Sequence, residues 1–364
     1  MSNPIVSFRG VSLVQKEANT LKQIEKQLQR RFISLKACYN SGALTPSETI
    51  GFFVKDAHVN TLLFTKADIT QFPEKLPVFK DLELINFEYN PEMPLSSNLI
   101  KLQSLRKLYL QNNHYSELPD FFSKFPCIEY IGLGDNDFTE FPEPLLKLTI
   151  LKDLDLKANK LASLPHQLKK LTSLFRINLD NNDFDTFPKA LLQLSNLQIL
   201  TLSKNNISVI PNSISKLFRL TILDLRRNEI SSLSDSFGKL TKLESLDLSH
   251  NNLKELPNSI GILHNLETLY LDHNKLQTLP SSFGGLTELV SLNLNGNQLK
   301  MLPAGFTQLT KLEHLSIFGA DKEWSTNKYL DLTPEQERFI NQIKLRYWMG
   351  WAKAASSEIK NLDK

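Results

Sequence analysis

The stretch LKDLDLKANKLASLPHQLKKLTS, residues 151–173, contains the pattern that decides the fold of this 364-residue chain. The pattern recurs every 23 residues without insertion, because twelve apolar residues from Val59 to Leu312 follow one another at that interval. In the nine complete repeats between Leu105 and Lys311, positions 1, 4, 6, 11, 14, 18 and 21 are apolar, counting Tyr115. A fixed period of this length predicts a stack of repeats, in which each repeat buries its apolar side against its neighbours.

Each repeat predicts one short strand followed by a returning turn. The LxxLxL segment alternates with period two, which is typical of a strand with its leucines pointing inward. Successive strands run the same way, so we expect a parallel sheet with strands about 4.8 Å apart. The second half, such as LPHQLKKLTS, is too short for a long helix and predicts short helical or 3₁₀ turns.

Position 9 is asparagine in ten consecutive repeats, from Asn90 to Asn297, with Ala67 and Ala320 at the corresponding places in the end repeats. An asparagine side chain has donors and an acceptor, and we expect it to satisfy backbone groups of its own and adjacent repeats. The alanines suit end repeats, which lack a neighbour on one side. The repeat from Leu82 has Pro91, Glu92 and Pro94 in its turn, and this predicts a local distortion.

The consensus LxxLxLxxNxLxxLPxxIxxLxx resembles the 23-residue class of leucine-rich repeats over residues 59–320, about 70% of the chain. That class includes plant intracellular Ras-group-related proteins, Scribble-like scaffold proteins and many prokaryotic repeat proteins. The resemblance implies an α/β repeat fold: a leucine-rich repeat solenoid curved into a horseshoe, with a parallel β-sheet on the concave face and short turns on the convex face. It also implies protein binding on the concave face. Ser234 departs from the consensus by replacing the usual proline.

A stack of repeats leaves an apolar surface open at each end, and other residues must cover it. We therefore divide the chain into an N-terminal cap at 1–58, twelve repeats at 59–320, of which the last is partial, and a C-terminal cap at 321–364. Residues 17–40 carry Leu21, Ile24, Leu28, Phe32 and Leu35 at helical spacing, and TPSE at 45–48 resembles a capping box. The segment GFFVKDAHVNTLLF predicts two short strands around Lys55-Asp56. A basic surface for a partner or phosphate at Arg30-Arg31 is the alternative use of the first cap.

The second cap predicts a helix that starts at Thr333-Pro334, with Gln336 as the capping-box partner of Thr333. Phe339, Ile343, Tyr347 and Trp351 follow on one face. Because basic residues surround them, a membrane surface or a partner protein is an alternative to simple capping.

Composition and motifs exclude several classes of function. The formal net charge of +3 does not favour nucleic acid, two cysteines cannot form a disulfide framework, and no run of 18 apolar residues is present. The N-terminus lacks a classical signal peptide, so we expect a cytoplasmic protein, with export by a non-classical route as the alternative. No phosphate-binding loop, dinucleotide fingerprint, zinc motif or nucleophile elbow occurs, so we expect no enzyme activity and no cofactor.

One metal-ligand pattern is present. His250 and His273 share a column in adjacent repeats, with Asp247 and Asp272 nearby. Two histidines about 5 Å apart with carboxylates could hold a metal ion. The same residues also fit the repeat consensus as solvated side chains, and this interpretation is the one we expect.

The outward strand positions 2, 3, 5, 7 and 8 form the expected binding face. Tyrosines in three consecutive repeats lie beside Gly132 and Gly134, which predicts a shallow floor between aromatic walls, and a mixed-charge group follows. Exposed tyrosine and arginine suit an interface, and mixed charge suits specificity. The candidate partner-binding residues are Tyr89, Tyr109, Tyr130, Asp155, Arg176, Asp180, Asp224, Arg226, Arg227, Asp247 and Tyr270.

These observations predict a monomeric, non-catalytic scaffold that binds another protein, with a role in signalling. The family resemblance alone suggests small GTPases, phosphatases or kinases as partners. The alternatives are recognition of a glycan or an anionic lipid, and an exported effector that acts on host proteins.

Overall fold

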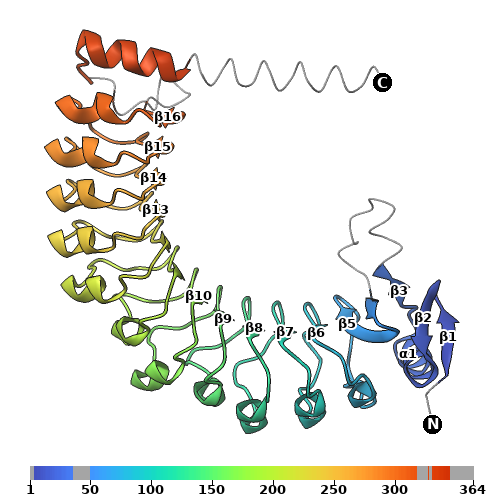
Figure 1. Cartoon of the computed structure of the whole chain (residues 1–364). Helices are drawn as coiled ribbons and strands as arrows, with labels where there is room; N and C mark the ends of the chain where they lie inside the picture. Colours follow the sequence, from blue (N-terminus) through green and yellow to red (C-terminus); the bar gives the residue numbers. More distant parts are fainter. Residues whose placement is uncertain (1–3, 36–49, 318–326, 328–329, 345–364) are drawn as a thin grey trace, which may run out of the picture. The chain divides into compact units, whose positions relative to one another are not determined.

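The computed structural model describes residues 4–35, 50–317, 327 and 330–344 (Figure 1). The chain forms two compact units, residues 1–182 and 183–364, and each is considered by itself.

The N-terminal unit contains a separate hairpin, a helix and a run of paired strands. β1 and β2 pair antiparallel and lead directly into α1; β3 then pairs parallel with β4, and β4 pairs antiparallel with β5. From β5 onward every strand pairs parallel with the next, and partners lie 23 residues apart, as Ile131 and Leu154 do. The elements are β1 (Ile5–Phe8), β2 (Val11–Val14), α1 (Gln15–Leu28), β3 (Ile33–Ser34), β4 (Ile50–Lys55), β5 (His58–Phe64), β6 (Leu84–Asn86), β7 (Lys107–Tyr109), β8 (Tyr130–Gly132), β9 (Asp153–Asp155) and β10 (Arg176–Asn178).

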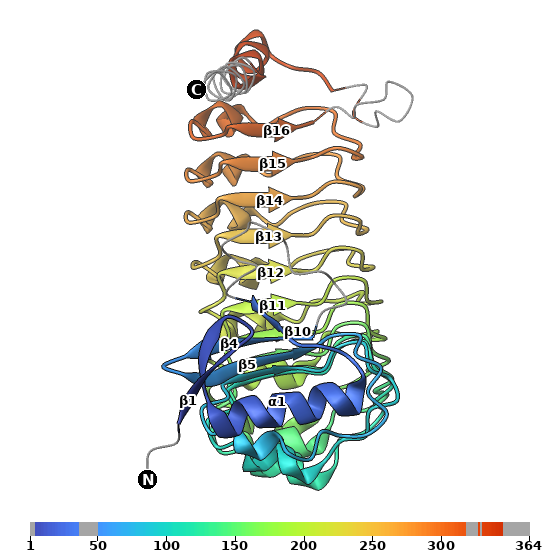
Figure 2. The ribbon, with the colours of Figure 1, turned by 90° about the vertical axis from the view of Figure 1, so that its right-hand side faces the viewer.

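The C-terminal unit continues the same architecture with six parallel strands, stacked one above another in Figure 2. A short 3₁₀ helix such as Asn258–Ile262 returns the chain after each of β11 to β15, as the sequence predicts. The strands are β11 (Ile199–Thr201), β12 (Ile222–Asp224), β13 (Ser245–Asp247), β14 (Thr268–Tyr270), β15 (Ser291–Asn293) and β16 (His314–Ser316). The leucine-rich repeat fold expected from the sequence is confirmed.

The asparagine ladder forms as expected. In Asn159, Nδ2 donates to the carbonyls of Leu133, Leu156 and Lys157 at 2.9–3.2 Å, and Oδ1 accepts from the Phe138 N–H at 3.1 Å. One buried side chain therefore satisfies backbone groups of two repeats, which explains why ten consecutive repeats keep asparagine here.

Position 8, immediately before each ladder asparagine, adopts a left-handed backbone. It has positive φ at Tyr89, Ala158, Arg227 and other non-glycine residues as well as at Gly296. This conformation is unfavourable for a residue with a Cβ. It allows the chain to turn inward after the strand, and the N–H at this position still donates to the next repeat, as Ala158 does to Asp180 at 2.7 Å.

The distortion expected in the repeat from Leu82 is present. In regular repeats the ladder oxygen accepts from the N–H at position 11 of the preceding repeat, but Asn113 Oδ1 accepts instead from the N–H of Asn90 at 2.7 Å. Met93 is buried, whereas the preceding Glu92 is exposed. The buried apolar side chain of this turn therefore stands one residue later than in regular repeats, at Met93 rather than at residue 92. Ser234, by contrast, causes little change, because its carbonyl accepts from Phe237 as the prolines of other repeats do.

The helix of the first cap is shorter than the helical spacing over residues 17–40 predicts. α1 ends at Leu28 and Gln29 adopts a left-handed conformation, so Phe32 and Leu35 are buried without continuing this helix. The β1–β2 hairpin was not predicted, whereas the two strands around Lys55-Asp56 are confirmed as β4 and β5. Phe32 packs edge-on against Phe64 of the first repeat, with centroids 5.5 Å apart.

Polar contacts also attach this cap to the first repeat. The buried carboxylate of Glu17 accepts from the Val59 N–H at 2.8 Å and contacts His58 Nδ1 at 2.9 Å. This contact raises the pKa of His58. Arg30 binds the Lys66 carbonyl and the Asp68 carboxylate, so its contacts are with the first repeat rather than with solvent alone.

The C-terminal helix begins as the sequence predicts. Gln336 N–H donates to Thr333 Oγ1 at 3.2 Å, Thr333 N–H donates to Gln336 Oε1 at 3.1 Å, and residues 334–344 are helical. Phe339 packs edge-on against Phe306, and Ile340 and Ile343 are buried. The described part of the helix therefore covers the last complete repeat.

The ladder has a member that the 23-residue register does not contain. Asn327 Oδ1 accepts from the Leu299 N–H at 2.9 Å, and its Nδ2 donates to Leu294 and Ile317. The predicted end of the ladder at Ala320, the capping box at 45–48, and Tyr347 and Trp351 on the last helix all lie outside the described residues.

Candidate functional site

The N-terminal unit brings two of the predicted tyrosines together on the outward face of its strands. Tyr109 of β7 and Tyr130 of β8 are half-buried, and their rings contact each other with centroids 4.6 Å apart at 39°. We call Tyr109, Gln111, Tyr130, Asp153 and Asp155 the tyrosine cluster. Burial raises the pKa of both tyrosines, so their hydroxyl groups stay protonated at neutral pH.

Gln111 fills the space that Gly132 leaves, whereas Gly134 faces the Lys157 carbonyl and the Asp155 carboxylate. A Cβ on Gly132 would stand only 2.2–2.5 Å from the Gln111 amide, so any larger residue there would displace it. The expected shallow floor is therefore occupied. Gln111 Nε2 donates to the Tyr130 hydroxyl at 2.9 Å, while Gln111 Oε1 is buried without a hydrogen-bond partner.

Two carboxylates border the tyrosine pair on β9. Burial raises the pKa of Asp153 despite the opposing effect of Arg176, whose Nη1 lies 3.4 Å from Asp153 Oδ2. Asp153 Oδ1 is buried without a partner. Burial also raises the pKa of Asp155, although its Oδ1 accepts from the Lys157 N–H at 3.0 Å. The cluster therefore has more acceptor atoms than the donors of the described residues satisfy.

The other candidates of this unit lie at the edge of that arrangement. Tyr89 stands at position 8, is 43% exposed, and has the Lys66 ammonium 5.4 Å from its ring centroid. The N–H of Asp180 donates to the side chain of Asn178, which holds the turn after β10.

The candidates of the C-terminal unit form a different group. Arg226 Nε lies 3.2 Å from Asp224 and its Nη1 lies 4.0 Å from Asp247, so one guanidinium bridges the acidic side chains of two repeats. Asp247 also accepts from the hydroxyl of Ser249 at 2.6 Å. Tyr270 follows Asp247 in the same column and is 38% exposed, and Arg227 stands exposed at position 8.

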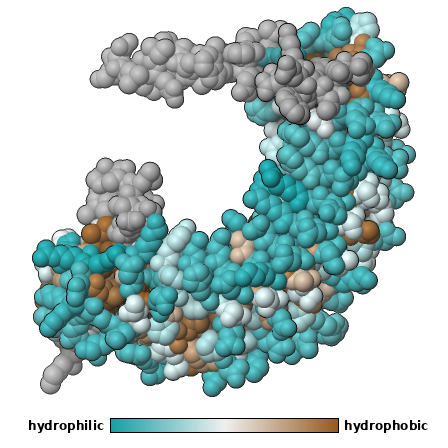
Figure 3. All heavy atoms as spheres, turned by 180° about the vertical axis from the view of Figure 1, so that it is seen from behind, coloured by the Kyte–Doolittle hydropathy of each residue, from teal (hydrophilic) through white to brown (hydrophobic). Residues whose placement is uncertain are grey.

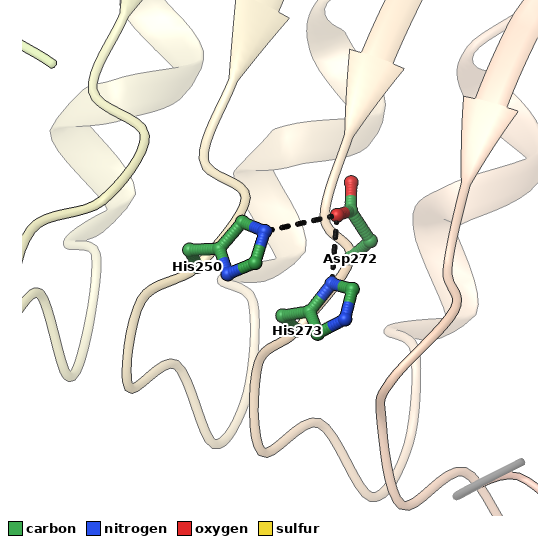
Figure 4. A group of neighbouring side chains, drawn as sticks. All are labelled: His250, Asp272 and His273. Carbon is green, nitrogen blue, oxygen red and sulfur yellow. Dashed lines mark hydrogen bonds and ion pairs between the residues drawn. The ribbon is translucent and has the colours of Figure 1, made fainter. Parts of the chain in front are cut away.

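The two histidines and Asp272 lie together at the ends of β13 and β14 (Figure 4). The rings of His250 and His273 are stacked and nearly parallel, with their centroids 4.2 Å apart. His273 Nδ1 lies 2.9 Å from Asp272 Oδ2, and His250 Nε2 lies 3.8 Å from the same oxygen. The pKa of His250 is lowered mainly by burial and secondly by the charge of the neighbouring His273.

Sequence reasoning did not single out Gln111 or Asp153, although both stand at outward positions of the repeat. The signal was available at Gly132, because a glycine in a strand often marks a close approach by another group. The role of Asn327 had no comparable signal, because it lies outside the repeat period.

On the side that Figure 3 shows, the hydrophobic atoms of the described residues appear in separate groups. Among the described residues, no helix is both long and apolar enough to cross a membrane.

Family comparisons agree with the fold. Residues 235–333 match a model described as a leucine-rich repeat region, and residues 185–230 and 104–125 match two further leucine-rich repeat models. The chain is a leucine-rich repeat protein. No protein of curated function matches the sequence.

Solved structures share the fold at low identity. A leucine-rich repeat protein of Leptospira interrogans is 26% identical with a TM-score of 0.50, over 74% of this chain and 84% of that chain. The structure of PEPR1–AtPEP1 is 26% identical with a TM-score of 0.56, over 77% of this chain and 44% of that chain. A third match is the leucine-rich repeats of FLRT2, which were solved in an octameric complex with latrophilin 3 and Unc5D. They are 23% identical with a TM-score of 0.57, over 75% of this chain and 89% of that chain.

Proposed function

We propose that this chain is a non-catalytic module that binds a partner protein through the outward face of its strands, with the tyrosine cluster as the anchor. The observation that carries the proposal is the contacting pair of Tyr109 and Tyr130 beside acceptors that have no partner among the described residues. Tyrosines in a water-poor setting, surrounded by residues that exclude solvent, are typical of the few positions that dominate binding energy.

The chemistry of the cluster favours a basic side chain on the partner. Asp153 and Asp155 are poorly solvated, as their raised pKa values indicate, and would be stabilised by a cation. A guanidinium could donate to their carboxylates and stack on a tyrosine ring, which a neutral side chain could not do. We therefore infer that the partner offers arginine or lysine to this cluster.

Two features support a protein as the ligand. The chain shares its fold with the solved structure of PEPR1–AtPEP1, although it spans 44% of that protein. The bridged Asp224, Arg226 and Asp247 provide separate charges that would favour one orientation of a large partner over others. The signalling role, the cytoplasmic setting, the monomeric state and the GTPase, phosphatase or kinase class of partner remain part of this proposal, and the last rests on family resemblance.

The experiment is affinity capture from native lysate with wild-type chain and with Tyr109→Ala/Tyr130→Ala as bait, followed by mass spectrometry. Captured proteins are then titrated calorimetrically. The double variant is expected to weaken binding by about 2 kcal/mol or more, as loss of an interface hot spot does. Tyr270→Ala is the matched comparison, because Tyr270 occupies the same repeat position as Tyr109 in the C-terminal unit.

A loss of binding with Tyr270→Ala alone would contradict the placement of the anchor. Reversing the charge at position 226 with Arg226→Glu is expected to slow association with the partner and to change the salt dependence of association. Dissociation should change less.

A glycan is the second candidate ligand, because the tyrosine rings lie beside side-chain acceptors. Capture that survives protease treatment of the ligand but not its deglycosylation would favour a glycan over a protein.

A further inference from the structure

The histidine cluster of His250, Asp272 and His273 has a geometry that the protein-binding proposal does not use. All three residues belong to the C-terminal unit, and one potential ligand atom from each lies within 4.8 Å of the other two. Figure 4 shows one nitrogen of each ring directed toward the same carboxylate. Three potential ligands therefore lie within one small region of the surface.

The distances fit a small ion. In a tetrahedral zinc site with bonds of about 2.0–2.1 Å, adjacent ligand atoms stand about 3.3 Å apart. The two histidine nitrogens lie 2.9 Å and 3.8 Å from Asp272 Oδ2, on either side of that value. The two imidazole rings are parallel, with centroids 4.2 Å apart, so both would also have to rotate about their side-chain torsions to direct a nitrogen lone pair at one ion.

The ligand types select a class of metal. Imidazole nitrogens prefer zinc, copper, nickel and iron, whereas calcium and magnesium prefer all-oxygen sites. The Asp272 side chain is 13% exposed and those of His250 and His273 are 40% and 57% exposed, so an ion can enter from solvent.

The adjacent repeat supplies a second, independent observation. Asn295 occupies the same repeat position as Asp272, and its buried Oδ1 has no hydrogen-bond partner among the described residues. The next residue is Gly296 at the position that His273 holds in its own repeat, and a Cβ there would stand 3.1 Å from the His273 ring. The neighbouring repeat thus leaves room for the His273 ring and has an oxygen without a partner.

We propose that His250, Asp272 and His273 bind one divalent transition-metal ion, with zinc as the ion that the ligand set fits best. Three protein ligands leave at least one coordination position of a four-coordinate ion for water or for an outside ligand. This proposal does not depend on the protein-binding function.

The test uses the full chain without a histidine tag and zinc chloride as the probe, in a buffer that does not bind metal. Isothermal titration is expected to show one zinc ion bound per chain. Thermal unfolding is expected to show a Tm that rises with zinc concentration, because the ion binds the folded state. His250→Asn/His273→Asn and, separately, Asp272→Asn are each expected to weaken zinc binding at least about tenfold, as loss of a ligand or of its support does.

Asparagine is chosen because it occurs naturally at the same repeat position with positive φ, at Asn112 and Asn181, so the double variant retains a residue suited to this backbone. His114→Asn is the matched control, because His114 pairs with Asp137 at 3.2 Å and is not part of the cluster. Absence of saturable zinc binding to the wild type would overturn the proposal. Equal affinity in the double variant and in His114→Asn would overturn it as well.

Discussion

The interior and the outward face of the same strand follow different rules, and β9 shows both within three residues. Leu154 is fully buried, and the same position is apolar in each complete repeat. Its neighbours Asp153 and Asp155 point to the other side of the sheet, where residues change from repeat to repeat. Burial thus constrains only one side of the strand, and specific function can be located on the other.

The largest expected effect in this comparison is at the interior. Leu154→Ala removes a fully buried side chain and is expected to lower the free energy of unfolding by about 2–5 kcal/mol. Urea denaturation followed by circular dichroism measures it. Lys157→Ala, at an exposed position of the same repeat, serves as the control and should change stability by less than about 0.5 kcal/mol. Similar values for the two variants would contradict the division into interior and face.

Removing the tyrosine pair should lower the free energy of unfolding by an amount between those of Leu154→Ala and Lys157→Ala. Tyr109→Ala/Tyr130→Ala removes half-buried rings in contact, so we expect a loss of about 1–2 kcal/mol, more than for fully exposed residues. Tyr109→Phe/Tyr130→Phe keeps both rings and should retain most of that stability. A loss in the alanine variant as large as that of Leu154→Ala would mean that these tyrosines belong to the core.

Asp153 predicts an effect that depends on pH. Because its pKa is raised above the ordinary 3.8, the folded state binds the proton more tightly than the unfolded state. The stability of the wild type is therefore favoured below pH 3.8 and falls as pH rises through the raised pKa. Asp153→Asn cannot ionise, so it should be more stable than the wild type at pH 7, with the difference shrinking toward pH 4. Equal unfolding free energies across that range would show that Arg176 already compensates the buried charge.

The smallest expected effect tests the turn that separates the two sides. Ala158 has a positive φ, which disfavours alanine more than glycine. Ala158→Gly should therefore raise stability by up to about 1 kcal/mol, after the entropy cost of glycine in the unfolded chain. The matched change Ala162→Gly, four residues later and outside the positive-φ residues, should lower stability slightly. The opposite order of these two variants would argue against strain at position 8.

Prediction from sequence was most successful where one physical requirement repeats. The period of 23, the parallel strands, the 3₁₀ turns and the asparagine ladder all follow from apolar and hydrogen-bonding groups that each repeat must satisfy. The capping box of Thr333 and Gln336 was also readable, because its contacts are local in the chain. The helix of the first cap was predicted too long, because Phe32 and Leu35 keep a helix-like spacing although α1 ends at Leu28.

The candidate sites were only partly predictable. The positions of Tyr109, Tyr130, His250 and His273 on the face follow from the register, but their contacts do not. The binding roles proposed for them are predictions that the experiments above test.

By itself, the sequence determined which residues face inward and how the repeats stack, because a strict period leaves one way to bury every leucine column. The tertiary structure decided what neighbouring repeats do to each other's outward side chains. Only the packed strands show that Gln111 fills the space above Gly132, that Asp153 keeps an unpartnered oxygen, and that two histidine rings stack over one carboxylate. Asn327 joins the ladder for the same reason, since hydrogen bonds depend on distance in space and not on position in the repeat.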